Sequence, residues 1–243
     1  MQLNLLLKAN KNLLMIFGIF KNMLSKVPEG YTRFKGEYHS GEADYLYREE
    51  HGHRIFHGPF SYVQKGNSDY IIKGEYVDNL KQGQWKFTRK NYERNSDFMV
   101  TFKDGRMTGP FVYKGTVTNI VANKIPFEIA MNLRDGLIVG DIVGLLDGRP
   151  FRGYCNEQGM ADGKWTLESY NNDDHMECEE WDNGVFIREY ERSTKTNSVK
   201  KMSTRLRAKL NDLLDNECNR LLQIVPRGTN GGLFLHVMRA ESK

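Results

Sequence analysis

The chain has 243 residues, of which 39% are hydrophobic and 27% are charged, a composition typical of a folded soluble protein rather than a disordered one. Its net charge of +4 comes from two basic flanks, because residues 1–35 hold six Lys or Arg against one Glu, and residues 188–209 hold eight against two acids. The middle is acidic, which argues against a continuous nucleic-acid-binding face. Three cysteines are too few for a disulfide framework and predict thiols in a reducing, cytoplasmic compartment.

The N-terminal segment, residues 1–30, combines apolar residues with lysines. Its uninterrupted apolar run, Leu13 to Phe20, has eight residues, whereas a helix that spans a bilayer needs about 20. A secretory signal has a similar outline, but no small-residue cleavage site follows before Pro28. A true start at an internal methionine would remove part of the segment.

As a helix, residues 1–26 would be amphipathic, with lysines on one stripe and leucines and phenylalanines on the wider face. Such a helix either docks on the rest of the protein, the simpler interpretation, or lies on a membrane surface. The residues predicted to contact a membrane are Lys8, Lys11, Phe17, Phe20 and Lys21.

Residues 31–192 repeat one unit of about 25 residues. Its clearest copy is Phe98–Phe102, the turn Asp104-Gly105 and a second strand, Gly109–Tyr113. Asp-Gly supplies the positive φ of a tight hairpin turn, and alternate large residues place their side chains on one face of a sheet. The second-strand glycines fall at 58, 83, 109, 140 and 163, with position 188 next, at intervals of 25, 26, 31, 23 and 25 residues.

The repeats predict about six hairpins, at 45–62, 70–87, 98–113, 127–142, 151–167 and 176–190. The long interval at 115–126 indicates an insertion or an extra strand. Each second-strand glycine is expected to let a neighbouring aromatic ring lie flat on bare backbone. One hairpin alone is marginally stable, but six in series form a continuous antiparallel meander. The fold class is therefore mainly β.

Gly74-Glu75-Tyr76 followed by Gly83-Gln84-Trp85-Lys86-Phe87 resembles the MORN (membrane occupation and recognition nexus) repeat. The resemblance covers roughly residues 36–190. Aromatic residues replace one expected glycine in four copies, at Phe60, Trp85, Phe111 and Trp165, as in divergent bacterial MORN-variant repeats, some of them antitoxin-like. The resemblance implies a repeat scaffold, with a partner protein or a membrane surface as its target.

The C-terminal part, residues 193–243, begins with a polar, basic linker. A helix is then predicted, capped by Ser203 or Thr204 and stopped before Pro226. Its apolar stripe comprises Leu206, Leu210, Leu213, Leu214, Cys218 and Leu221, and Asp212, Asp215 and Glu217 occupy the other face. We expect the helix to dock against the end or open face of the sheet and cover the terminal repeat. Residues 233–237 have the composition of a last strand.

Two clusters carry residues suited to chemistry. His51, His53 and His57 have a spacing that can bind Zn²⁺ or Ni²⁺, but the repeat places them around a hairpin turn, where histidines are usually solvated. Asp173-Asp174-His175 suggests cation binding or base catalysis, but it falls at a hairpin connection, and a polar turn is the simpler explanation. Neither a phosphate-binding loop nor a nucleophile elbow occurs, so we assign no catalytic, cofactor or metal residues.

The sequence thus predicts a non-catalytic repeat scaffold that binds a protein partner through a sheet face or edge. The alternatives are a protein held peripherally on a membrane by its N-terminus and, less favoured, a metal protein or enzyme using residues 51–57. Fold-level analogy carries the first prediction.

Overall fold

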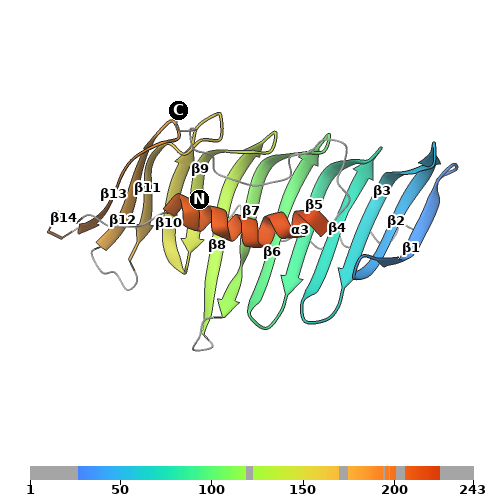
Figure 1. Cartoon of the computed structure of the whole chain (residues 1–243), viewed down its shortest axis with the longest axis horizontal. Helices are drawn as coiled ribbons and strands as arrows, with labels where there is room; N and C mark the ends of the chain where they lie inside the picture. Colours follow the sequence, from blue (N-terminus) through green and yellow to red (C-terminus); the bar gives the residue numbers. More distant parts are fainter. Residues whose placement is uncertain are drawn as a thin grey trace, which may run out of the picture.

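The structure is a computed structural model that describes residues 27–118, 123–169, 175–193, 195–196, 198–200 and 206–224. The described residues form one antiparallel sheet of fourteen strands, and the strands lie side by side in the order of the sequence (Figure 1). The predicted mainly-β meander is confirmed. The strands are β1 (Thr32–Tyr38), β2 (Gly41–Glu50), β3 (His53–Gln64), β4 (Asp69–Val77), β5 (Leu80–Lys90), β6 (Arg94–Lys103), β7 (Arg106–Thr118), β8 (Lys124–Arg134), β9 (Leu137–Leu146), β10 (Arg149–Cys155), β11 (Gly163–Glu168), β12 (His175–Asp182), β13 (Val185–Ser193) and β14 (Val199–Lys200).

All six predicted hairpins are present, as β2–β3, β4–β5, β6–β7, β8–β9, β10–β11 and β12–β13. The strand β1 was not predicted from the sequence, and it pairs with β2 along its whole length. The long interval at 115–126 adds no strand among the described residues. Instead β7 continues to Thr118 and β8 begins at Lys124, so both strands are lengthened.

The hairpin turns adopt the left-handed conformation that the turn residues predicted. His51 and Asp104 have φ values of 49° and 50°, so His51 stands at the equivalent turn position. Several turns also donate an N–H to a carbonyl oxygen of the preceding hairpin, and neighbouring units are therefore joined at their turns as well as along their strands. These bonds are Asn79 to Phe56 (2.9 Å), Gly105 to Lys81 (3.0 Å), Gly136 to Met107 (2.8 Å) and Gly184 to Ala161 (2.8 Å).

The second-strand glycines have a different role from the predicted one. Their φ values lie between 64° and 80°. The register of the hairpin shifts beside the first four of them, Gly58, Gly83, Gly109 and Gly140, so each of these four opens a β-bulge. At Gly83 a Cβ atom would meet nothing within 4 Å, whereas at Gly74 it would lie 2.0 Å from the ring of Trp85. The expectation about the ring was wrong in position, because the bulge turns Trp85 back over the first strand of its own hairpin.

One face of the sheet, here called the inner face, carries the large side chains of alternate residues. Phe87 and Phe98 stack with ring centroids 4.5 Å apart, and Phe60 stacks on Trp85 at 5.8 Å. All four rings are at most 1% exposed. Aromatic side chains bury about 150–250 Å² each, so this layer of rings is the main source of cohesion between hairpins.

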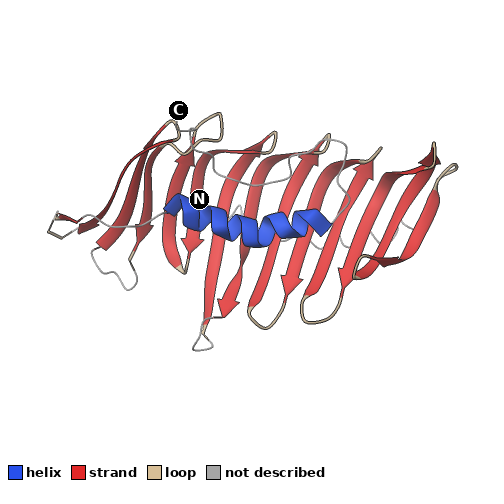
Figure 2. Ribbon diagram, in the orientation of Figure 1, coloured by secondary structure: helices blue, strands red, loops and turns tan. Residues whose placement is uncertain are grey.

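A continuous helix crosses the inner face from β10 toward β5 (Figures 1 and 2). It consists of α2 (Leu206–Leu213), the π-helical turn η2 (Leu214–Asn219) and α3 (Arg220–Ile224). At 1.5 Å per residue it is about 28 Å long, which matches about six strand spacings. The predicted helix and its docking on an open face are confirmed, while Ser203 and Thr204 lie outside the described residues.

The buried apolar side chains of this helix recur every four residues, as Leu206, Leu210, Leu214, Cys218 and Leu222. In a regular α-helix each step of four residues advances about 40° beyond a full turn, so such a row would rotate away from the sheet. The wider π turn takes up this excess. The predicted stripe differs here, because Leu213 is only partly buried and Leu222 continues the row.

Candidate functional site

The three histidines considered as metal ligands do not converge. His51 and His53 are exposed at the turn and at the start of β3. His57 instead contacts the next hairpin, with Nδ1 3.3 Å from Oδ1 of Asp78 and its ring 4.9 Å from that of Tyr31. Among the described residues, no group of three or more His, Cys, Asp or Glu side chains is placed to hold a metal ion.

Arg48 binds the same carboxylate oxygen of Asp78 that His57 approaches. The guanidinium donates to Oδ1 of Asp78 at 2.6 Å, to the hydroxyl of Tyr31 at 3.0 Å and to Glu50 at 2.7 Å. The hydrogen bond from Arg48 holds the pKa of Asp78 below its usual value. This network joins the first hairpin to the turn of the second, which is a structural task.

The other residues predicted to form sites lie partly outside the described residues, and the rest make structural contacts. Asp173 and Asp174 lie outside the described residues, and His175 has Nδ1 3.1 Å from the carboxylate of Glu191. The membrane-contact residues Lys8, Lys11, Phe17, Phe20 and Lys21 also lie outside them, so that hypothesis stays a prediction. Within the described ranges no helix is long and apolar enough to cross a membrane. The three cysteines are free thiols in buried positions.

The inner face is occupied, and a buried carboxylate fastens the helix to it. Glu179 on β12 is 2% exposed and accepts hydrogen bonds from the backbone N–H groups of Leu206 and Arg207 and, at 3.0 Å, from the indole of Trp181. Burial raises the pKa of Glu179, and the three donors partly oppose that shift. The sequence pattern did not predict this contact, because local capping signals point only to the residues next to the helix, Ser203 and Thr204.

The opposite, outer face of the sheet carries a short apolar row. Met99, Val112, Ala130 and Val143 stand directly opposite one another on β6, β7, β8 and β9. Val112 is 39% exposed and Val143 is 42% exposed. The row therefore runs across four strands in contact with solvent, on a face that is otherwise mostly polar. The alternation of side chains along each strand could have predicted that each of these residues lies on the outer face. The bulges set the register between strands, and the register determines that the four residues stand opposite one another.

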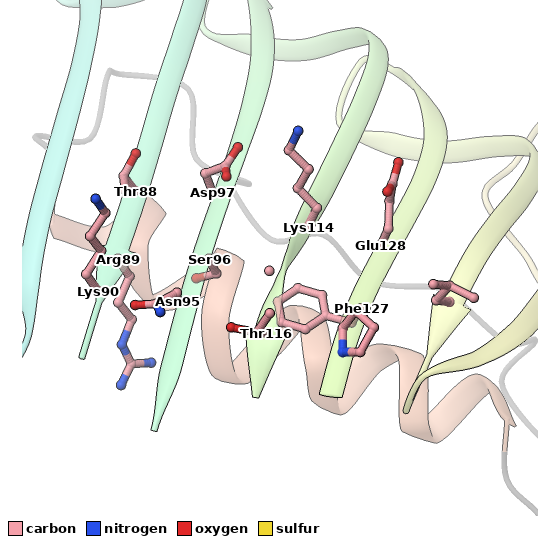
Figure 3. Close-up of a pocket in the computed structure, with 13 residues that line it drawn as sticks. Thr88, Arg89, Lys90, Asn95, Ser96, Asp97, Lys114, Thr116, Phe127 and Glu128 are labelled. Atoms are coloured by element: carbon pink, nitrogen blue, oxygen red, sulfur yellow. The ribbon is translucent and has the colours of Figure 1, made fainter. Parts of the chain in front are cut away.

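A hollow of about 340 Å³ lies beside this row, at one end of β5–β9. Thr88, Asp97, Lys114 and Glu128 form one of its walls, on the side of the sheet that faces away from the helix (Figure 3). The other wall comes from Lys90, Asn95, Thr116 and Pro126. The hollow offers charged groups of both signs together with hydroxyl and amide groups, which suits contact with a polar surface better than enclosure of a small apolar ligand.

The chain matches no protein-family model, no curated protein and no solved structure. The resemblance to MORN-type repeats therefore stays a prediction from the repeat pattern, and the geometry of the sheet is the basis for assigning a function.

Proposed function

We propose that the protein is a non-catalytic, MORN-like repeat scaffold that binds a protein partner through the outer face of its sheet. The observation that carries this proposal is the row of Met99, Val112, Ala130 and Val143, which is apolar and partly exposed on a face that is otherwise mostly polar. The inner face has its own cover, because the C-terminal helix lies across it (Figure 2).

The surroundings of the row have the composition of an interface. Protein–protein interfaces combine an apolar centre with a polar, solvated rim and are enriched in aromatic residues and arginine. The apolar row has the charged wall of the hollow on one side, Arg152 directly opposite Val143 in the next strand, and Tyr154, 39% exposed, farther along β10.

The experiment compares partner capture by the full chain and by two variants. Val112→Glu combined with Val143→Glu places two charges in the centre of the row. Val77→Glu is the matched control, because Val77 is 38% exposed on β4, away from the row. A partner that wild type and control capture from the native organism should be lost with the double variant, and its affinity for the purified double variant should fall at least about tenfold.

Folding must be checked alongside binding. Substitutions at exposed positions away from special backbone features change stability by about 0.5 kcal/mol or less, so urea unfolding should give similar midpoints for all variants. Undiminished binding by the double variant, or equal loss with Val77→Glu, would contradict the proposal.

A further inference from the structure

The last long strand of the sheet has an open edge. β14 pairs with β13 only at Glu191 and Arg192, so residues 185–190 have β12 on one side and, among the described strands, nothing on the other (Figure 1). In an antiparallel strand, alternate residues direct both N–H and C=O away from a given neighbour. This open segment, Val185–Tyr190, therefore presents backbone donors and acceptors that an added strand could use.

The open segment is also apolar and exposed at its start. Val185, Phe186 and Ile187 are 53%, 46% and 54% exposed. Phe186 packs beside a residue at the edge of the core, with its ring 5.3 Å from that of Trp181 at an interplanar angle of 67°. A long, apolar, unpaired edge strand is a template for pairing with another chain.

The other end of the sheet shows what a protected edge looks like in this protein. The exposed side chains of β1 include Arg33, Lys35 and Glu37, and charges of this kind are the usual protection of an edge against pairing. Arg33 is further held by Asp44 on β2. The apolar start of the open segment lacks such protection, so the two edges differ in chemistry and not only in position.

We propose that Val185–Tyr190 binds an extended segment of another protein, which adds a strand to the sheet end to end with β14. The segment should carry an apolar side chain beside Phe186 and a Lys or Arg beside Glu189. The reason for the basic residue is the position of Glu189, directly opposite Glu179. Glu189 is half-buried and makes no ion pair with any described residue, so the carboxylate is unmatched on this side of the strand.

The neighbouring carboxylates do not compete for that basic residue. Arg149 binds Glu177 at 2.6 Å, His175 lies beside Glu191, and helix N–H groups bind Glu179. Arg188 is likewise engaged, because it holds Glu180 through two hydrogen bonds of 2.6 and 3.0 Å.

A second copy of this chain fits the open segment poorly. Antiparallel pairing of two copies centred on Arg188 or on Glu189 would place like charges directly opposite each other, which is destabilising. Pairing centred on Ile187 would set Phe186 opposite Arg188. Pairing centred on Phe186 would join only Val185–Ile187, because the turn at Asn183-Gly184 ends the strand. The edge therefore suits a strand of different sequence.

The test uses the full chain and two end-capped octapeptides as probes. Both alternate Thr with Val or Ile, and they differ only in carrying one central Lys or one central Glu. Hydrogen–deuterium exchange should show that the Lys peptide protects amides within 185–190. Fluorescence anisotropy should show binding weakened about tenfold or more by Phe186→Lys or Ile187→Lys. Val199→Lys is the matched control, because Val199 is 63% exposed on β14, beside the open segment, and it should leave binding unchanged.

Glu189→Lys tests the charge preference. It should weaken the Lys peptide and strengthen the Glu peptide, each by about 1.5- to 5-fold, the range expected of one cross-strand ion pair. A preference that does not reverse, or equal loss of binding with Val199→Lys, would overturn the proposal.

Three other results would also overturn it. One is protection, in the chain alone, of those amides of residues 185–190 that point away from β12, which would mean that the protein covers its own edge. Another is a dimer in sedimentation equilibrium that Ile187→Lys abolishes, which would assign the edge to a second copy. The third is the absence of protection by either peptide at about 1 mM. Val112 and Val143 lie elsewhere, so this test and that of the outer face can fail independently.

Discussion

The second and sixth hairpins have the same strand–turn–strand architecture but differ in the residues at the glycine positions and in how their aromatic rings are buried. In β4–β5, a glycine on each strand lets Trp85 lie on the backbone at Gly74, and the ring is fully buried. In β12–β13, Arg188 stands where the second glycine would be, the bulge shrinks to a single extra residue, and Phe186 stays 46% exposed.

The difference shows how one repeat can serve two purposes. Where the glycine pair is present, the aromatic rings of the hairpin are buried against the adjacent hairpins, and the hairpin packs only on its neighbours in the array. Where the pair is absent, carboxylates occupy the inner positions, and one of them, Glu179, holds the helix that covers the sheet. The sixth hairpin thus ends the repeat array, binds its cover and leaves an edge open.

The largest effect should come from removing the sealed ring. Trp85→Ala should cost about 3–5 kcal/mol of unfolding free energy, because it deletes a fully buried aromatic side chain. Phe186→Ala should cost less than about 0.5 kcal/mol, as expected of an exposed position. Urea unfolding of both variants measures the comparison, and similar losses would show that the two hairpins are packed alike.

Local signals explain why the hairpins could be predicted. Asp104-Gly105 and the alternation of Phe98 to Phe102 act within one unit, so the sequence reveals them without knowledge of neighbours. The strand β1 was missed because its turn, His39-Ser40, lacks the Asp-Gly or Asn-Gly signature, although His39 adopts a positive φ of 52°.

Features that depend on distant neighbours could not be predicted. Lys81 is 1% exposed, yet nothing in its segment distinguishes it from a solvated lysine. Glu179 meets the helix only because the chain returns across the sheet, and the outer-face row aligns only after the bulges shift the register. Sequence periodicity predicts which face of the sheet a side chain lies on. Which residues of the neighbouring strands stand beside it depends on the register between strands, which the periodicity does not give.

The carboxylate that holds the helix should give the next largest effect. Glu179→Gln should destabilise the protein by about 1–3 kcal/mol, because the amide has one acceptor oxygen where the carboxyl group has two, which leaves a buried N–H group of the helix start or of Trp181 without its acceptor. Glu189→Gln, directly opposite on β13, is the matched control and should change stability by less than about 0.5 kcal/mol. Thermal or urea unfolding measures both, and an equal loss would remove the special role of Glu179.

A substitution under the ring sharpens the role of the glycine pair. Gly74→Ala should cost about 1–3 kcal/mol, because the added methyl group meets the ring of Trp85 and forces it to move. The same substitution made together with Trp85→Ala should cost much less, so a double-mutant cycle should give a coupling of about 1 kcal/mol or more. Additive losses would mean that the ring does not need a bare backbone at this position.

The two hairpins should also respond to pH with opposite signs. Burial lowers the pKa of Lys81, which lies among the rings of Tyr76, Trp85 and Phe102, to about 8. Above that pH the unfolded chain binds more protons at this group than the folded one, so stability should rise between pH 8 and 10, by at most about 1.4 kcal/mol per pH unit. Burial also raises the pKa of Tyr76. Above about pH 10 the folded chain therefore binds more protons at this group than the unfolded chain, and stability should fall again with rising pH.

Glu179 gives the opposite slope at the acidic end. Burial raises its pKa in the folded state above the ordinary 4.5, so the folded chain holds the proton more tightly and the contribution of Glu179 to stability falls as pH rises through that range. Other carboxylates, such as Asp78, have a lowered pKa and act in the reverse sense, so the effect is read as the difference between wild type and Glu179→Gln. Lys81→Met should likewise abolish the rise above pH 8. If the pH dependence of the unfolding free energy stays the same in Lys81→Met and Glu179→Gln, other groups cause it. The contrast between a cation buried among rings and an anion buried at a helix start would then be wrong.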